Sequence, residues 1–249
     1  MSDIVLETRN LKRSFGAFLA TNDVSLKVER GARHALIGPN GAGKTTLINL
    51  LTGVLPPSEG QVLLEGEDIT SLASFRRVKR GLTRTFQINQ LFNDFTPLET
   101  VALAIAEREG IGHNLWTSIA GYGSIVEEAA ALLARFGLAS VMGERSVILP
   151  YGKQRLLEIA LAFASRPRVL LLDEPAAGVP EDERHEVLTI VSDLPSDVTM
   201  LLIEHDMDLV FSFANRISVL VAGALFTEGT VAEISADPRV KAVYLGENA

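Results

Sequence analysis

The chain has 249 residues, 47% of them hydrophobic and 22% charged, which is an ordinary balance for a globular protein with a full core. Its net charge of −8 argues against a nucleic-acid-binding surface, and the lack of cysteine excludes disulfides and thiolate metal sites. The N-terminal residues do not resemble a secretory signal, and no apolar run is long enough to cross a bilayer. We therefore expect a soluble, cytoplasmic protein, for which any membrane role requires a partner.

The N-terminal part of the chain is predicted to consist of short strands and turns. Ile4–Thr8 and Val24–Val28 alternate apolar with polar residues, which is the pattern of half-buried strands. We expect Lys12–Gly16 to be a turn that carries one aromatic residue. Gln61–Leu64 is predicted as a further strand, closed by a turn at Glu65–Gly66.

Between these strands lies Leu36–Thr46, L-I-G-P-N-G-A-G-K-T-T, which fits the phosphate-binding pattern G-x-x-x-x-G-K-[ST]. Its glycines allow amide N–H groups to turn toward phosphate oxygens, Lys44 supplies a charge for the β- and γ-phosphates, and the Thr45 hydroxyl can ligate Mg²⁺. We expect a buried strand before the loop and a helix that ends near Gly53. The residues predicted to bind nucleotide here are Gly38, Pro39, Asn40, Gly41, Ala42, Gly43, Lys44, Thr45 and Thr46.

The middle of the chain, residues 88–148, is predicted to be a helical subdomain inserted into a core formed by residues 1–87 and 149–249. Capping boxes at Thr96–Glu99 and Ser124–Glu127 indicate two helix starts, and Gly137 follows the end of the second helix. The link between these helices, Gly110–Gly123, contains the single tryptophan, Trp116. A basic cluster before the insertion is predicted to be a solvated helix face and comprises Arg76, Arg77, Lys79 and Arg80.

The C-terminal part returns to alternating helices and strands, which predicts an α/β fold with a largely parallel sheet and helices on its faces. The predicted helices are Tyr151–Ala164, Glu181–Asp193, Met207–Phe213 and a tail that starts at the capping box Thr230–Glu233. The predicted strands are Val169–Leu172, Met200–Ile203 and a hairpin of Ile217–Val221 with Leu225–Thr227.

A second motif, V-L-L-L-D-E-P, ends the continuous apolar strand at Val169–Leu172 with two carboxylates. Ligands bind at the carboxyl edge of such parallel strands, and a solvated strand end is an unlikely alternative after four buried aliphatic residues. Asp173 suits the coordination shell of Mg²⁺, and Glu174 suits the activation of a water for attack on the γ-phosphate.

Together these motifs resemble the ATP-binding-cassette (ABC) ATPases along the whole chain. The resemblance implies a P-loop core with a mostly parallel sheet, an antiparallel β subdomain and an inserted helical subdomain, with ATP and Mg²⁺ as cofactors. It also implies that Phe15 stacks on adenine, that Gln87 reaches the metal and the water, that Glu174 is the general base and that His205 is the switch histidine. An isolated histidine after a strand is more often structural, but the position of His205 in I-E-H-D favours the switch role.

The family signature L-S-G-G-Q, which completes the ATP site of the opposite subunit in a head-to-tail dimer, is altered in this chain. The matching segment is Leu149, Pro150, Tyr151, Gly152 and Lys153, so that proline replaces serine and lysine replaces glutamine. Losing the serine hydroxyl removes one charge-assisted hydrogen bond, worth about 1.5–3 kcal/mol. A proline at the first helical position and the Gly152 amide still allow the helix N-terminus to face phosphate.

A further departure lies after the second motif, where Ala177-Gly178-Val179-Pro180 replaces the usual Ser-Ala-Leu-Asp. The departures fall on the segments that face a partner's nucleotide, which favours a heterodimer with a second ABC ATPase subunit over a homodimer. His34, His113 and His185 match no motif and are assigned structural roles.

Details of the segments L-x-Y-G, E-P-A-A-G and D-P-R-V-K-x-V-Y-L-G-E are similar to ATPases for uptake of branched-chain amino acids and related small molecules. The resemblance implies transmembrane permease subunits as partners, a substrate-binding protein as an indirect partner, no nucleic acid, and a peripheral position on the inner face of the membrane. We expect the loop Asn89–Phe95 to receive a permease helix, with burial of Leu91, Phe92 and Phe95 in the core as the alternative. A lipopolysaccharide-export ATPase and a non-transport ABC ATPase are the rival hypotheses, while a binding module without catalysis is opposed by Lys44 and Glu174.

Overall fold

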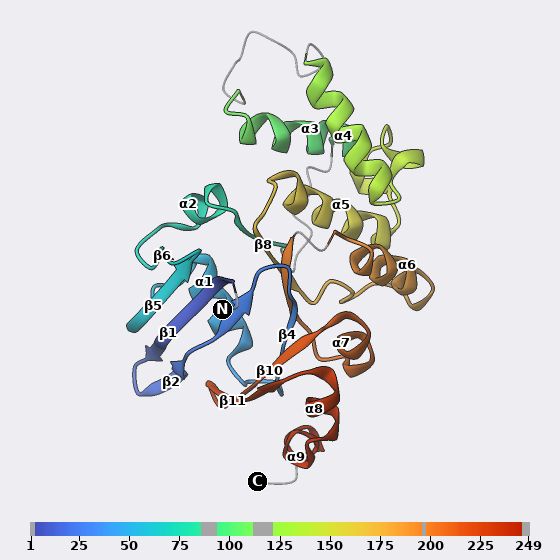
Figure 1. Cartoon of the computed structure of the whole chain (residues 1–249). Coiled ribbons are helices and arrows are strands. Elements are labelled where there is room, and N and C mark those ends of the chain that lie inside the picture. Colours follow the sequence, from blue (N-terminus) through green and yellow to red (C-terminus); the bar gives the residue numbers. More distant parts are fainter. Residues whose placement is uncertain (1–2, 86–93, 112–121, 196–197, 246–249) are drawn as a thin grey trace. The chain divides into compact units, whose positions relative to one another are not determined.

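The structure is a computed structural model that describes residues 3–85, 94–111, 122–195 and 198–245 (Figure 1). The chain forms two compact units. Unit 1 consists of Met1–Arg84, Arg168–Glu174 and Pro195–Ala249, and unit 2 consists of Thr85–Pro167 and Pro175–Leu194. The predicted insertion boundaries at residues 88 and 148 stay a prediction.

Unit 1 contains two sheets. The first is antiparallel with the order β2-β1-β5-β6, and β3 also pairs with β1; its strands are β1 (Ile4–Phe15), β2 (Phe18–Val24), β3 (Lys27–Glu29), β5 (Glu59–Leu64) and β6 (Glu67–Asp68). The second has the order β11-β10-β4-β9-β8-β7 and is parallel except for β11. Its strands are β4 (Arg33–Ile37), β7 (Leu82–Arg84), β8 (Val169–Asp173), β9 (Thr199–Ile203), β10 (Arg216–Val221) and β11 (Ala224–Gly229). The predicted α/β fold is confirmed.

The predicted turn at Lys12–Gly16 is wrong. Strand β1 continues to Phe15, which pairs with Phe18, and the chain reverses at Gly16, whose φ of 60° glycine adopts without strain. The predicted strand Val24–Val28 is also wrong, because Val24 ends β2 and a separate β3 begins at Lys27. Strand β1 is longer than the segment in which apolar and polar residues alternate, because its C-terminal part pairs with the partly exposed strand β2.

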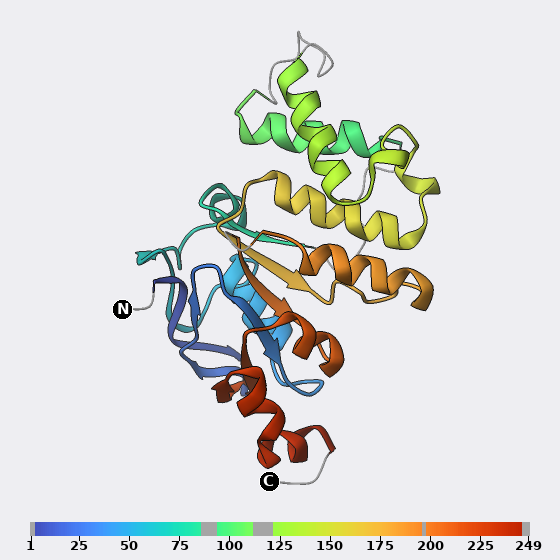
Figure 2. The same ribbon diagram turned by 45° about the vertical axis from the view of Figure 1, so that its right-hand side comes forward.

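Helix α1 (Lys44–Thr52) is buried in the main core of unit 1. Its residues Leu47, Ile48, Leu50 and Leu51 join one hydrophobic cluster with residues of both sheets, such as Leu6 of the first and Leu171 of the second. The other face of the parallel sheet is covered by α7 (Met207–Phe213), α8 (Val231–Ala236) and α9 (Pro238–Leu245), which lie together in Figures 1 and 2. A sheet covered on both faces explains the continuous apolar strands that the sequence contains.

The predicted solvated basic cluster is wrong for Arg77, which lies in the short helix α2 (Ser74–Lys79) and is 1% exposed. Its guanidinium donates to the carbonyls of Leu50 and Leu51 at the end of α1, at 2.8 and 2.6 Å, and to those of Thr70 and Leu72. A cation at a helix C-terminus satisfies carbonyls that have no partner within the helix. Arg77 therefore caps the helix that begins with Lys44. The neighbouring basic residues Arg76, Lys79 and Arg80 are exposed as predicted.

Unit 2 is built from α3 (Pro97–Arg108), α4 (Gly123–Arg135), α5 (Tyr151–Ala164) and α6 (Glu181–Ser192), with short 3-10 turns at Ala139–Val141 and Ser146–Ile148. The capping box at Thr96 and Glu99 is confirmed, as is the one at Thr230 and Glu233 in unit 1. The box predicted at Ser124–Glu127 is wrong. Helix α4 starts at Gly123, two residues before the start that a cap at Ser124 implies, so Ser124 lies inside the first turn and no side chain caps the helix.

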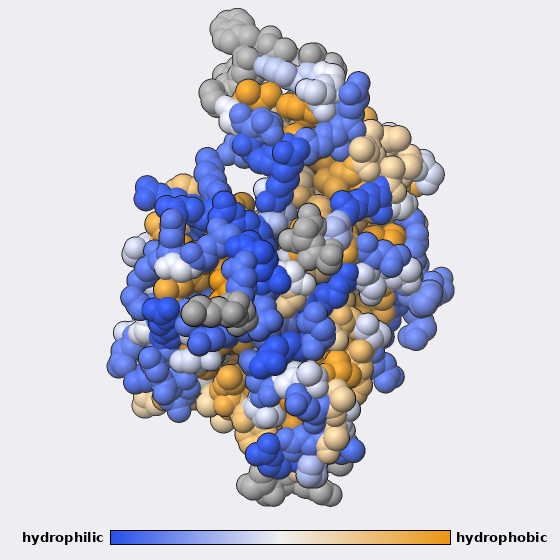
Figure 3. All heavy atoms as spheres, in the orientation of Figure 1, coloured by the Kyte–Doolittle hydropathy of each residue, from blue (hydrophilic) through white to orange (hydrophobic). Residues whose placement is uncertain are grey.

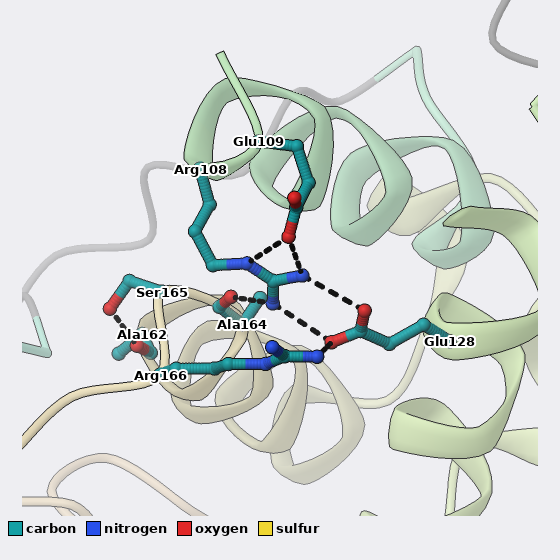
Figure 4. A network of polar contacts seen from close by, with 7 residues as sticks. All are labelled: Arg108, Glu109, Glu128, Ala162, Ala164, Ser165 and Arg166. Carbon is teal, nitrogen blue, oxygen red and sulfur yellow. Dashed lines mark hydrogen bonds and ion pairs between the residues drawn. The ribbon is translucent and has the colours of Figure 1, made fainter. Parts of the chain in front are cut away.

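An arginine clasp joins three helices of unit 2 (Figure 4). Arg108, the last residue of α3, donates to Glu128 of α4 at 2.8 and 2.9 Å and to the carbonyl of Ala164 at the end of α5 at 2.9 Å. Arg166 reaches Glu128 from the following turn. The hydrogen bonds from Arg108 lower the pKa of the Glu128 carboxyl, which indicates a favourable contact. The clasp fixes the end of α5 opposite to its Pro150 end.

In the described part of the chain, no helix has the length and apolar character that a membrane span requires. The face shown in Figure 3 carries mainly hydrophilic residues, with hydrophobic residues in scattered groups.

Candidate functional site

The phosphate loop of unit 1 joins β4 to α1, as the sequence predicts. Gly38, Gly41 and Gly43 all have positive φ, at 155°, 80° and 96°. A Cβ at Gly38 would lie 2.2 Å from the Leu220 carbonyl oxygen, so this position requires glycine for close packing as well as for its conformation. Gly41 has open space around it. The loop is thus anchored against its own sheet on one side and open on the other.

Lys44 is half-buried at the start of α1. Its ammonium donates to the carbonyls of Gly38 at 2.5 Å and Pro39 at 3.1 Å, so the side chain folds back over the loop. Burial lowers the pKa of Lys44, whereas the nearby carboxylates of Glu174, Asp173 and Glu204 raise it. The tertiary fold has therefore brought the lysine of the first motif close to the acids of the second.

Asp173 ends β8 as the sequence predicts and is 3% exposed. Its Oδ2 accepts a hydrogen bond of 2.5 Å from Nη2 of Arg84, the last residue of β7. Nη1 of the same guanidinium donates to Oδ1 of Asn49 on α1, at 2.8 Å. Sequence reasoning missed Arg84 and Asn49, because only the parallel pairing of β7 with β8 brings Arg84 to this sheet edge.

Glu174 adopts a φ of 44°, which is uncommon for a residue with a side chain and is held by a hydrogen bond from its amide to the Ile203 carbonyl. One carboxylate oxygen lies 3.5 Å from Nδ1 of His205, which is also 3.5 Å from a carboxylate oxygen of Glu204. The predicted base and the predicted switch histidine are therefore neighbours within unit 1.

Glu204 is a further residue that sequence reasoning missed. It is 3% exposed and accepts hydrogen bonds from the amides of His205 and Asp206, at 2.8 and 3.2 Å. Burial raises the pKa of its carboxyl, while these amides lower it. The side chain shapes the turn from β9 to α7 and thereby sets where the His205 imidazole lies.

Phe15 lies at the end of β1 with 45% of its surface exposed. The guanidinium of Arg13 lies 4.8 Å from the ring centroid. An exposed ring with a cation at this distance can stack on a purine base. Gln87 and most of the predicted docking loop, including Leu91 and Phe92, lie outside the described residues, as do Trp116 and His113.

The signature segment begins α5 in unit 2. The sequence predicts Pro150 at the first helical position. In the structure Pro150 is the N-cap, and Tyr151 is the first helical residue. The Gly152 amide donates to Oε2 of Glu183 in the first turn of α6, at 2.5 Å, and its ability to face phosphate stays a prediction. Lys153 donates to Glu186 at 2.7 Å and to the Gly137 carbonyl at 3.1 Å. A carboxylate from α6 thus accepts from an amide in the first turn of α5, where the N-cap residue Pro150 has no side-chain hydrogen bond to the helix.

The donor set at the sheet edge fits Mg²⁺. In the described residues no group of three or more His, Cys, Asp or Glu side chains forms a metal site on its own. Mg²⁺ is commonly held by one or two protein oxygens together with substrate phosphates and water. The exposed Thr45 hydroxyl and the Asp173 carboxylate offer such oxygens next to the phosphate loop.

A phosphate loop beside a strand that ends in Asp-Glu, in a parallel sheet, defines a P-loop ATPase. The family model described as ABC transporter matches residues 21–177, and one described as branched-chain amino acid ATP-binding cassette transporter matches residues 225–249. The chain belongs to the ABC transporter family and is an ATPase.

Similar proteins cover the whole chain. The high-affinity branched-chain amino acid transport ATP-binding protein BraF of Pseudomonas aeruginosa is 40% identical, with 99% of this chain and 100% of that protein covered. The corresponding protein LivG of Escherichia coli K12 is 37% identical with the same coverage. Among solved structures, the ADP conformation of MJ1267, an ATP-binding cassette of an ABC transporter, matches with a TM-score of 0.84 and 32% identity over 98% of this chain and 99% of that one.

Proposed function

We propose that this ATPase drives the import of branched-chain amino acids or related small molecules through a membrane permease. The observation that carries the proposal is the whole-length similarity to the BraF and LivG ATP-binding proteins, together with the C-terminal match at residues 225–249. The lipopolysaccharide-export ATPase and the non-transport ABC ATPase have no comparable support.

Within this function, the loop residues from Gly38 to Thr46 bind the ATP phosphates and Phe15 stacks on adenine. Thr45, Gln87 and Asp173 hold Mg²⁺, which neutralises charge on the phosphates when it is bound. Glu174 accepts the proton of the attacking water, and its distance of 3.5 Å from His205 suits a base whose neighbour contacts the γ-phosphate.

The ATPase works as a peripheral subunit on the inner face of the membrane, attached to transmembrane permease subunits. The docking loop is Asn89–Phe95, and a substrate-binding protein delivers the cargo on the other side. Nucleic acid has no part in this function. Phe92→Asp tests the docking loop: it should uncouple hydrolysis from transport while the purified subunit still hydrolyses ATP. An unfolded variant would instead support burial of Phe92 in the core.

The test of the substrate is uptake by the transporter reconstituted in proteoliposomes with ATP on the side of this subunit. Radiolabelled leucine, isoleucine and valine should accumulate, and Lys44→Ala should abolish the accumulation because the phosphate charge is no longer neutralised. Glutamate is the matched control substrate. Uptake of glutamate alone, or no uptake with an intact ATPase, contradicts the proposed substrate class.

We further propose that the subunit pairs with a different ABC ATPase. The motif residues for its own nucleotide match the family, whereas Pro150, Lys153 and Pro180 in the segments presented to the partner do not. In a mixed dimer, Glu174→Gln in this chain should slow hydrolysis more than the equivalent change in the partner. Equal effects contradict the asymmetry. The control is Pro150→Ser, which should raise turnover at the partner's site by restoring the hydroxyl.

A further inference from the structure

Arg84 occupies a position between the two elements that carry the proposed Mg²⁺ residues. One arm of its guanidinium contacts Asp173 at 2.5 Å, and the other contacts Asn49 at 2.8 Å. Asn49 lies one helical turn after Thr45 on α1, so the two residues share a side of that helix. Arg84 therefore links the helix turn next to Thr45 with the carboxylate at the end of β8.

The ion pair between Arg84 and Asp173 is largely buried, so its loss should change the free energy of unfolding. The side chains of Arg84 and Asp173 are 14% and 4% exposed, and the Arg84 Nε is buried without a hydrogen-bond partner among the described residues. Removing one partner of a buried ion pair leaves the other charge uncompensated, which costs far more than the pair itself contributes. The guanidinium contacts Asp173 through Nη2 and Asn49 through Nη1, so its rigid planar group sets the distance between the carboxylate and the α1 side chain.

We propose that Arg84 is a positioning residue for the ATPase reaction: it serves as the counter-ion of Asp173 before the metal arrives and ties that carboxylate to α1 through Asn49. The Mg²⁺ part of this inference rests on the proposed function of Asp173. A bound dication must then share Asp173 with a cation that is already present. Arg84 thereby lowers the affinity of Asp173 for Mg²⁺, but it also holds the carboxylate in place before the metal binds.

The test is a double-mutant cycle in the full chain, with thermal unfolding without metal as its first measurement. Arg84→Met should lower the Tm by roughly 5–10 °C. The same change in an Asp173→Asn background should cost less than half as much, because no buried charge is left unpaired. Arg80→Met is the matched control, since Arg80 pairs with Glu67 on the surface, and it should change the Tm by less than about 2 °C.

The second measurement is binding of a fluorescent ADP analogue, titrated with Mg²⁺, which needs no hydrolysis. Arg84→Met should lower the Mg²⁺ midpoint about tenfold, because the competing charge is gone. Arg84→Lys keeps the charge but lacks the planar fork that holds Asp173 and Asn49 on separate nitrogens, so its midpoint should stay near that of the wild type while its Tm falls. If Arg84→Met fails to fold, Arg84→Gln replaces it in both measurements.

An equal Tm loss in the presence and absence of the Asp173 charge overturns the proposal, and so does an unchanged or raised Mg²⁺ midpoint. Failure of the proposed function has a different signature. If Asp173→Asn alone keeps the Mg²⁺ midpoint of the wild type, Asp173 does not hold the metal, and the unfolding cycle still decides whether Arg84 is its counter-ion.

Discussion

The phosphate loop and the signature segment both present backbone amides at the start of a helix, yet they differ in what those amides face. At α1 the N-cap is Gly43, no side chain caps the helix and its first turn has no acidic residue. At α5 the N-cap is Pro150, and Glu183 of α6 already accepts from the Gly152 amide. The first site is open to a phosphate, whereas the second carries an anion of its own.

A helix N-terminus is open to an external anion only where the fold supplies no internal anion. Two of the carboxylates near the phosphate loop, Asp173 and Glu204, are engaged by Arg84 and by backbone amides. Glu183 and Glu186, in contrast, engage the signature residues themselves. Helix α1 has no side-chain cap at its N-terminus, whereas in α5 the Gly152 amide already donates to Glu183.

The largest effect should come from the chemistry at the open site. Glu174→Gln should slow hydrolysis by about 10²–10⁴-fold, because the amide cannot accept a proton while its shape is kept. ATP binding should stay within about twofold of the wild type. Steady-state phosphate release and size-exclusion chromatography with and without MgATP are the measurements. Glu29→Gln, at an exposed position of strand β3, is the control, and wild-type turnover in the Glu174 variant would remove it from the role of base.

The second prediction tests whether Arg77 stabilises the C-terminus of α1, the helix that follows the phosphate loop. Arg77→Met should destabilise the protein by about 2–4 kcal/mol, because two carbonyls at the end of α1, those of Leu50 and Leu51, and the carbonyl of Thr70 lose their donor. Chemical denaturation measures the loss. Arg76→Met, the exposed neighbour on the same helix, should change stability by less than about 0.5 kcal/mol. Similar losses in both variants would show that Arg77 is not the cap of α1.

Strand β4, which precedes the phosphate loop, contains the buried His34, and this histidine makes the free energy of unfolding depend on pH. Burial lowers the pKa of His34 to about 4 from an unfolded value of 6.5, and Nε2 of its ring lies 2.7 Å from the Ser218 hydroxyl. The neutral form is favoured in the fold, so this stability is fully present above pH 6.5 and is lost as the pH falls toward 4. About 1–1.5 kcal/mol should disappear between pH 7 and pH 5.5.

His34→Gln should flatten this part of the pH dependence, measured by chemical denaturation at both pH values. The exposed His185 provides the control, since His185→Gln should leave the slope unchanged. A slope that persists without His34 would assign the effect to carboxylates.

The smallest effect is expected from weakening the hydrogen bond between the Glu183 carboxylate and the Gly152 amide at the start of α5. In a Glu174→Gln background, Glu183→Gln should strengthen ATP-dependent association about threefold, because a neutral amide competes less with phosphate for the Gly152 amide. Analytical ultracentrifugation with MgATP measures it. Asp182→Asn removes the same charge from the neighbouring exposed position and should have little effect. Equal gains in both variants would indicate a general charge effect instead of a local cap.

The local patterns in the sequence predicted much of the fold correctly. The bounds of α5, the end of α1 at Gly53 and the capping boxes at Thr96 and Thr230 are confirmed, because each depends on residues within one or two helical turns. The errors at Lys12–Gly16 and at Ser124 arose where pairing with another strand, or a helix start two residues earlier, overrode the local signal.

The candidate residues for the chemistry could be predicted from the sequence, since Lys44, Asp173 and Glu174 belong to short motifs in which the spacing along the chain fixes the local geometry. The partners of these residues could not, because they lie on other elements of the fold. Arg77 was predicted to be solvated and is a buried cap, Arg84 was not singled out and contacts Asp173, and Glu183 was not singled out and occupies the Gly152 amide. Each of these contacts joins two elements that are separate in the sequence. A long polar side chain can reach its partner from many positions, so such contacts produce no repeating pattern from which they could be predicted.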